Sequence, residues 1–175
     1  DSKGLLTLVD GSEFIFRAYY ALPPLTRSDG MPINAVLGYC NMLWRLITDN
    51  KSDILLVIFD TARKSFRNNI YSEYKANRGE PPDDLKPQFS LVRDATEAFN
   101  IFYVEKSGYE ADDIIATYAT KANSENWNVQ IISSDKDLMQ LVHDNIYMYD
   151  PMKMAVIGEE EVYKKFGVKP DRVRD

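Results

Sequence analysis

Short runs of apolar residues alternate along this chain with longer segments in which apolar residues recur at helical spacing. Nearly continuous apolar runs are typical of strands that are buried on both faces of a sheet. They predict strands at Leu5–Val9, Ile54–Phe59 and Val129–Ile132, with a further short strand at Ile101–Val104. Because these strands alternate with helical segments, the pattern predicts an α/β sandwich with a mainly parallel central sheet flanked by helices.

Apolar residues spaced three and four positions apart predict the helices that separate the strands. The segment Asn34–Asp49 has this spacing over its whole length, and Asn34 is a suitable N-terminal cap. Proline and glycine turn signals in the second half of residues 11–33 predict a loop there. Late in the chain, Ile146–Tyr149 and Met154–Ile157 are predicted to form a small hairpin. The other predicted helices are Leu85–Phe99, Glu110–Ala122, Lys136–Val142 and Glu159–Phe166.

The composition is that of an ordinary globular domain. The chain has 175 residues, of which 45% are hydrophobic and 27% charged, which suits one domain with a proper core. No apolar run approaches the roughly 20 residues that a membrane span needs, so no membrane association is expected. Cys40 is the only cysteine, which excludes an intramolecular disulfide and fits a cytoplasmic protein. We therefore expect a single domain over residues 1–175 in a cytoplasmic monomer.

Aspartates follow three of the predicted strands. Asp10, Asp60 and Asp135 stand at or just after the carboxyl ends, and the acidic sequence Glu110-Ala-Asp112-Asp113 opens a predicted helix. Because the carboxyl ends of parallel strands meet at one edge of a sheet, these carboxylates are expected to converge. Like charges in such a group are costly unless a cation lies among them. A single aspartate after a strand is often only a helix cap, but that explanation is poor for the whole set.

The candidate ligands are all carboxylates, which favours Mg²⁺ or Mn²⁺ over zinc. Two divalent ions would bring four positive charges to seven negative ones. The site would then be occupied by metal and could still hold metal-bound water. The chemistry that most often uses two Mg²⁺ ions without a protein nucleophile is phosphodiester hydrolysis. The seven candidate metal ligands are Asp10, Asp60, Glu110, Asp112, Asp113, Asp135 and Asp137.

The distribution of charge leaves room for a nucleic-acid partner in spite of a net charge of -6. Without the seven candidate ligands, 20 of the 27 acidic residues remain against 21 basic ones. A basic and aromatic segment directly follows Asp60. Cations interleaved with aromatic rings suit a phosphate backbone and unstacked bases, although a solvated surface helix fits the same pattern. The candidate DNA-binding residues are Arg17, Lys64, Arg67, Tyr74, Lys75 and Arg78.

Two other classes of phosphate chemistry fit the sequence poorly. A phosphatase of the haloacid-dehalogenase type has a second aspartate two residues after the nucleophilic one, but this chain reads Asp10-Gly11-Ser12. No glycine-rich Walker loop is found either, which argues against an ATPase.

The motifs around the acids and the basic segment occur in a specific order. Leu8-Val9-Asp10-Gly11-Ser12 is followed by Phe59-Asp60, and then by Lys64-Ser65-Phe66-Arg67. The later motifs are Tyr74-Lys75-Ala-Asn77-Arg78, Gly108-Tyr-Glu110-Ala-Asp112-Asp113 and Ser134-Asp135-Lys-Asp137. Together they resemble the 5′→3′ exonuclease domain of bacterial DNA polymerase I over essentially the whole chain. The resemblance implies the flap-endonuclease superfamily, with a PIN-like (resolvase-like) core and an arch-like basic segment at about residues 61–84.

The resemblance also implies a role for each matched residue. Lys75 and Arg78 correspond to arch residues that engage the scissile phosphate and are the expected catalytic cations, and Tyr74 is available for base stacking. Lys64, Arg67 and Arg17 correspond to other phosphate contacts. Among the acids, the first metal is implied for Asp10, Asp60, Glu110 and Asp112, and the second for Asp135 and Asp137 with support from Asp113.

The function implied by the resemblance is metal-dependent, structure-specific 5′→3′ exonuclease or flap-endonuclease cleavage of DNA in primer removal and repair. The expected partners are DNA with 5′ flaps or nicks, RNA–DNA primers and a polymerase module joined to this domain. The family's further acidic motif, Gly-Asp-x-x-Asp-Asn, and its helix-hairpin-helix module do not occur in these 175 residues. We therefore expect a complete first metal site and an incomplete second one. Two alternatives stay open, a PIN-type ribonuclease and a catalytically impaired DNA-binding fragment.

Overall fold

The computed structural model describes residues 2–49, 52–61, 82–143, 145–151, 155–166 and 170. Its strands are β1 (Gly4–Asp10), β2 (Ile54–Ile58), β3 (Phe102–Val104), β4 (Trp127–Ile132), β5 (Ile146–Asp150) and β6 (Ala155–Ile157). Its helices are α1 (Gly11–Ala21), α2 (Asn34–Asp49), α4 (Gln88–Ala98), α5 (Ala111–Ser124), the 3-10 helix η1 (Lys136–Leu141) and α6 (Glu159–Phe166). The basic arch-like segment expected at about residues 61–84 lies largely outside the described residues.

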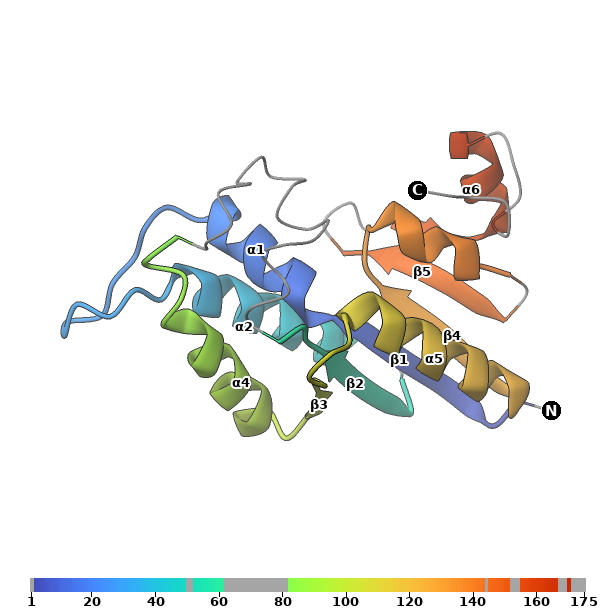
Figure 1. The fold of residues 1–175 in the computed structure, drawn as a ribbon, viewed down its shortest axis with the longest axis horizontal. Helices are drawn as coiled ribbons and strands as arrows, with labels where there is room; N and C mark the ends of the chain where they lie inside the picture. Colours follow the sequence, from blue (N-terminus) through green and yellow to red (C-terminus); the bar gives the residue numbers. More distant parts are fainter. Residues whose placement is uncertain are drawn as a thin grey trace. The chain divides into compact units, whose positions relative to one another are not determined.

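The described strands form one sheet in the order β3-β2-β1-β4-β5-β6 (Figure 1). Strand β4 pairs in parallel with both β1 and β5, whereas β6 returns antiparallel to β5. The prediction of an α/β fold with a mainly parallel sheet and flanking helices is confirmed. Among the described residues, no helix combines the length and the apolar composition that crossing a membrane requires.

Contacts within the chain divide it into two compact units. Unit 1 comprises Asp1–Asp10, Lys51–Leu56 and Asp112–Asp175, and unit 2 comprises Gly11–Asn50 and Val57–Ala111. The division passes through β2. The expectation of a single domain over residues 1–175 stays a prediction.

The core of unit 1 lies in the parallel strands. Leu8 is opposite Ile131, which is in turn opposite Met148, and all three side chains are buried. Apolar residues at successive positions of β1 and β4 are buried, as the continuous apolar runs predict for central strands. The pairing also aligns Val9 with Ile132. The carboxyl ends of β1 and β4 therefore finish at the same level, with polar residues immediately beyond both.

Unit 2 contains the helices α1, α2 and α4. Helices α1 and α2 approach closely at Gly38, where an added Cβ would lie 2.7 Å from the Cβ of Ala18. The α1 helix was not predicted from the sequence. Its residues Phe14, Ile15 and Phe16 are consecutive and all buried, and a short continuous apolar run of this kind cannot be assigned to helix or strand by periodicity alone.

A buried side chain of α4 completes the start of α2. The fully buried Gln88 accepts a hydrogen bond from the backbone N–H of Val36 at 3.0 Å and donates to Asn34 Oδ1 at 2.9 Å. Asn34, the expected cap, donates its own amide to the Tyr19 carbonyl oxygen at 3.1 Å. One of the unpaired N–H groups of the first helical turn is thus satisfied by a residue 52 positions later.

Candidate metal centre

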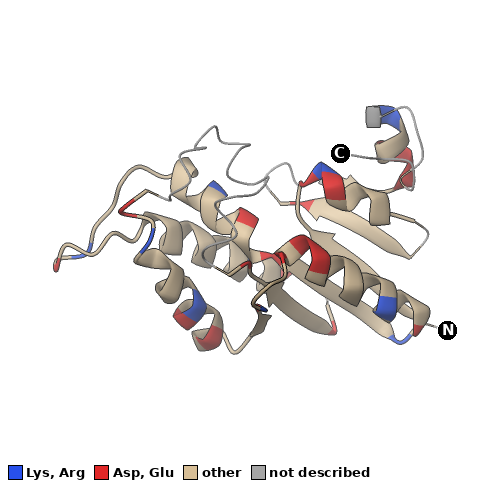
Figure 2. Cartoon of the chain, viewed as in Figure 1, with Lys and Arg blue, Asp and Glu red and all other residues tan. Residues whose placement is uncertain are grey.

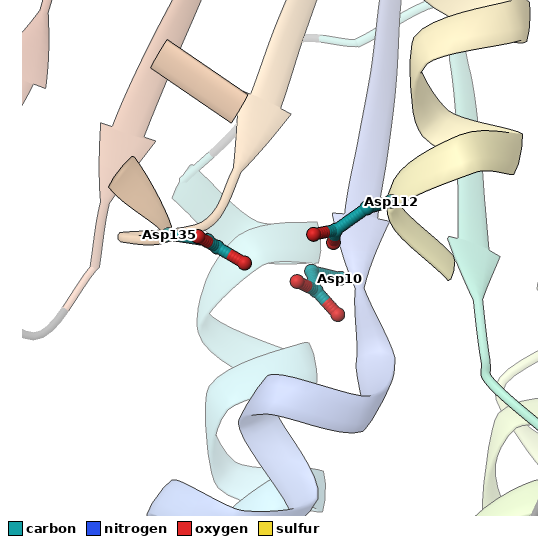
Figure 3. Close-up of side chains that lie close together, drawn as sticks. All are labelled: Asp10, Asp112 and Asp135. Carbon is teal, nitrogen blue, oxygen red and sulfur yellow. The ribbon is translucent and has the colours of Figure 1, made fainter. Parts of the chain in front are cut away.

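Three carboxylates of unit 1 lie close together at the ends of its secondary-structure elements. Asp10 is the last residue of β1, Asp112 lies in the first turn of α5, and Asp135 follows β4. Each offers one carboxylate oxygen, and these oxygens all lie within 4.8 Å of one another. Figure 3 shows the three side chains directed towards a common space. We call these three residues the acidic group.

A serine on the loop after β4 links two members of the acidic group. Asp10 and Ser133 are both fully buried. The hydroxyl of Ser133 lies 3.4 Å from Asp10 Oδ2, to which it donates, and accepts the backbone N–H of Asp135 at 3.0 Å. Asp135 also caps η1, because its Oδ1 accepts the backbone N–H of Asp137 at 2.9 Å. These bonds orient two members of the acidic group, Asp10 and Asp135, at the ends of β1 and β4.

The first turn of α5 contributes two acids with different surroundings. Figure 2 shows the red of acidic residues on this turn. Asp112 is half-buried there, whereas Asp113 is exposed. Acidic residues in a first turn are favoured by the positive end of the helix dipole. Asp137 is half-buried in η1. Asp113 and Asp137 are not members of the acidic group, and their expected roles at a metal stay predictions.

Asp60 belongs to unit 2 and is held at three of its own atoms. Its side chain is buried, and its backbone N–H donates to the Ser12 hydroxyl at 2.7 Å. Its carbonyl oxygen accepts from Arg93 Nη2 at 3.3 Å, and its Oδ1 accepts the backbone N–H of Ala111. Glu110, the residue before Ala111, is half-buried. The metal roles expected for Asp60 and Glu110 are not tested by this arrangement.

The residue after Asp10 is a glycine because no side chain fits at its position. A Cβ at Gly11 would lie 2.5 Å from a ring carbon of Phe59 and 2.8 Å from Cγ1 of Val57. Both neighbours are fully buried and cannot move aside easily. The start of α1 can therefore pack against the end of β2 only with glycine at this position.

Of the candidate DNA-binding residues, Arg17 lies in the described part of the chain. Its Nε is 3.3 Å from Oε1 of Glu13, one turn earlier on α1, and the side chains are 18% and 4% exposed. The same helix carries Tyr19, whose hydroxyl donates to Asp84 at 2.5 Å. Burial and then this hydrogen bond raise the pKa of Tyr19 above its ordinary value. Lys64, Arg67, Tyr74, Lys75 and Arg78 lie outside the described residues.

The acidic group has the donor set of a hard divalent cation. It offers oxygen atoms alone, without the histidine or cysteine that zinc usually selects. Two of its three members are half-buried, so water could complete a coordination shell. Three like charges so close together repel one another in the absence of a cation. The residues present therefore fit Mg²⁺ or Mn²⁺.

Sequence reasoning overlooked three residues that hold the candidate acids in place. Ser133 stands two positions before Asp135, and a serine at that spacing was a signal that could have been used. Ser12 and Arg93 had no such signal, because they are 48 and 33 positions from Asp60, which they hold.

Comparison with known proteins identifies relatives along nearly the whole chain. The model of the family described as 5′-3′ exonuclease, N-terminal resolvase-like domain, matches residues 5–167. A DNA polymerase I from Rhizobium leguminosarum is 56% identical, over 97% of this chain and 18% of the relative. A 5′-3′ exonuclease from Aquifex aeolicus is 42% identical, over 97% of this chain and 59% of the relative. The chain thus spans less than two thirds of the length of either relative.

Two solved structures share the fold. The T5 D15 protein, crystallised with metal ions, superposes with a TM-score of 0.66 at 19% identity, over 94% of this chain and 60% of that one. The catalytic core of Rad2 in complex with a DNA substrate gives a TM-score of 0.54 at 16% identity, over 97% and 52%. The resemblance inferred from the motifs is confirmed, and the chain belongs to the family of 5′-3′ exonuclease N-terminal resolvase-like domains.

Proposed function

We propose that this chain is the catalytic part of a metal-dependent, structure-specific nuclease that hydrolyses DNA phosphodiesters as a 5′→3′ exonuclease or flap endonuclease. The observation that supports this most directly is the convergence of Asp10, Asp112 and Asp135 at the ends of β1, α5 and β4. Family membership supplies the class of reaction. A binding module without hydrolysis would have no need of three acids held so close together.

The proposed cofactor is Mg²⁺ or Mn²⁺, held first by the acidic group. When bound, divalent ions supply positive charge that lowers the pKa of a nearby water and stabilises the phosphate oxygens. The buried Asp10 and its neighbour Ser133 keep one carboxylate in place before any ion arrives. The other acids proposed to take part in binding two ions are Asp60, Glu110, Asp113 and Asp137.

The proposed substrate is DNA with a 5′ flap or a nick, including RNA–DNA primers. Two of the relatives are named DNA polymerase I and 5′-3′ exonuclease, and the Rad2 core is described with a DNA substrate. We propose Lys75 and Arg78 as the cations that engage the scissile phosphate, and a cytoplasmic monomer joined to a polymerase module as the natural setting. The other proposed DNA contacts are Arg17, Lys64, Arg67 and Tyr74.

A cleavage assay tests the proposal. A labelled DNA carrying a 5′ flap is incubated with the full chain in Mg²⁺, in Mn²⁺ and in a chelator, beside the variants Asp112→Asn and Asp94→Asn. Asp94 is an exposed acid of α4 and serves as the matched control. Cleavage should need the ion, survive in Asp94→Asn and be lost in Asp112→Asn.

The same assay separates the alternatives. Preferential cleavage of the corresponding RNA would favour a PIN-type ribonuclease. Tight binding of the flap with no cleavage in either ion would favour a DNA-binding fragment. Equal cleavage by wild type and Asp112→Asn would refute the metal site itself.

A further inference from the structure

The guanidinium of Arg93, on α4, makes four kinds of contact within unit 2. Its Nε and Nη2 bind Glu105 Oε1 at 2.6 Å and Oε2 at 3.1 Å. Its Nη1 donates to the carbonyl oxygen of Phe89 at 3.0 Å, and its Nη2 donates to that of Asp60 at 3.3 Å. Its Cζ lies 4.6 Å from the centre of the Phe59 ring. One side chain therefore holds two consecutive residues, Phe59 and Asp60, together with a carboxylate beyond β3.

These contacts depend on the shape and the burial of the arginine. A guanidinium is planar and presents its donors as a rigid fork, so it can bind a carboxylate with two bonds while a further N–H reaches a carbonyl oxygen. The side chain of Arg93 is 16% exposed and that of Glu105 is 32% exposed. Partial exclusion of water makes such a pair stronger and more rigid than one at the open surface. A lysine would keep the charge and lose the fork.

Arg93 also completes the set of bonds that orient Asp60. Ser12 holds the backbone nitrogen of Asp60, Arg93 holds its carbonyl oxygen, and the N–H of Ala111 holds its carboxylate. With both backbone polar groups fixed, the direction of the Cα–Cβ bond is fixed as well. Phe59, the residue before Asp60, is held as well, because its fully buried ring lies under the guanidinium.

Through its bond to Glu105, the same arginine also holds the segment that leads to Glu110. Glu105 directly follows β3, and Glu110 stands five residues later, at the approach to α5. The bidentate bond anchors the chain where it leaves the sheet, before it reaches Glu110. Both acids of unit 2 that the proposed function assigns to a metal thus lie on segments tied to one guanidinium.

We propose that Arg93 is a positioning residue, which fixes the carboxylate of Asp60 and the path of the chain towards Glu110 in the orientation that divalent-ion binding requires. This inference rests on the proposed function, since it takes Asp60 and Glu110 as metal ligands. The competing explanation is an ion pair that stabilises α4 against β3 and has no effect on the acids.

Ion affinity, measured without any turnover, tests the inference. Mn²⁺ binding to the full chain is followed by calorimetry or by the electron paramagnetic resonance of free Mn²⁺. Partners one contact away from a metal ligand typically change affinity about 10–100-fold when they are removed, so Arg93→Ala should weaken Mn²⁺ binding at least tenfold. Arg93→Lys should recover part of the loss, because an ammonium group can still donate to the Asp60 carbonyl oxygen.

Two further variants separate positioning from stability. Glu105→Ala breaks the same ion pair and leaves the arginine free to bind Asp60, so it should lower the melting temperature while weakening Mn²⁺ binding less than Arg93→Ala does. Arg27→Ala removes another bidentate pair, with Asp29, whose bonds are 3.2 and 2.9 Å long, and should leave the affinity unchanged.

The outcomes are distinct. Equal Mn²⁺ affinities in wild type, Arg93→Lys and Glu105→Ala, with Arg93→Ala either unchanged or unfolded, would overturn the positioning role. Asp60→Ala is measured in parallel. If it too binds Mn²⁺ normally, the assignment of Asp60 in the proposed function fails, whereas a loss confined to Asp60→Ala refutes the role of Arg93 alone.

Discussion

The carboxylates of the acidic group in unit 1 and the carboxylate of Asp60 in unit 2 are held in place in different ways. In the acidic group, three carboxylate oxygens lie within 4.8 Å of one another, and the hydroxyl of Ser133 donates to Asp10 at 3.4 Å. Asp60 receives a backbone N–H on its carboxylate, as Asp135 does from Asp137, but it is also anchored at both of its backbone polar groups.

The crowding of like charges points to the acidic group as the part that a cation stabilises most. The hydrogen bond from the neutral N–H of Ala111 favours the charged form of Asp60 whether or not an ion is present. The acidic group has mutual repulsion that a divalent ion relieves. We therefore expect that, in the ion-free protein, Asp112→Asn stabilises the fold whereas Asp60→Ala destabilises it.

The largest expected effect is on catalysis. Asp112→Asn should reduce flap cleavage in Mg²⁺ by more than the roughly 10–100-fold that is typical of a residue one contact away from a ligand. In a chelator the same variant should melt at a higher temperature than wild type, because one of three like charges is gone. A lower melting temperature in the chelator would show that repulsion does not dominate the acidic group.

Ion binding should stabilise the wild type and leave Asp112→Asn nearly unchanged. A ligand at about 100 times its dissociation constant adds about 2.7 kcal/mol to the free energy of unfolding. For a chain of this size that is a rise of roughly 5–10 °C in melting temperature. Scanning calorimetry with and without Mn²⁺ measures both proteins, and parallel shifts would place the ion away from the acidic group.

Asp60→Ala should destabilise the ion-free protein, in contrast to Asp112→Asn. Its removal leaves the backbone N–H of Ala111, a buried residue, without its acceptor. An unsatisfied buried donor costs about 1–3 kcal/mol. Urea unfolding in a chelator gives the change directly, and Asp60→Asn is the control, since its amide oxygen can still accept. An unchanged midpoint for Asp60→Ala would erase the contrast between the two regions.

Ser12→Ala should produce the smallest loss. It removes the hydroxyl that accepts the N–H of Asp60 at 2.7 Å, while the carbonyl and carboxylate anchors remain. The expected decrease in the free energy of unfolding is about 1 kcal/mol, as for a typical buried hydrogen bond. Cleavage should fall modestly. A loss of activity as large as that of Asp112→Asn would mean that Ser12 does more than hold Asp60.

The apolar pattern predicted most of the fold because strands β1, β2 and β4 read as continuous apolar runs, and β1 and β4 are largely buried on both faces. Helix α1 was not predicted in the same way, because Phe14, Ile15 and Phe16 form a short continuous apolar run, which fits a helix as well as a strand. The short helices and the small hairpin were predicted from turn signals and local spacing, which depend on neighbouring residues alone.

The candidate site could be predicted for the residues that stand at the ends of strands. Asp10 and Asp135 follow paired parallel strands, so their convergence follows from topology, and Asp112 joins them from the start of a helix. The anchors of Asp60 follow from tertiary packing instead. Ser12 lies 48 positions from Asp60 and Arg93 lies 33, and no local pattern connects such pairs. The roles expected for the basic segment came from the resemblance alone and stay predictions.

Gly11 has a consequence at the level of the gene. Every missense change of a glycine codon adds a Cβ, and at this position a Cβ would lie 2.5 Å from the ring of a fully buried Phe59. The codon of Gly11 should therefore tolerate silent changes and no others, although the residue has no functional group of its own. In a saturation-mutagenesis screen it should be depleted of missense variants as strongly as the codon of Asp10, a proposed metal ligand, although the glycine itself does no chemistry.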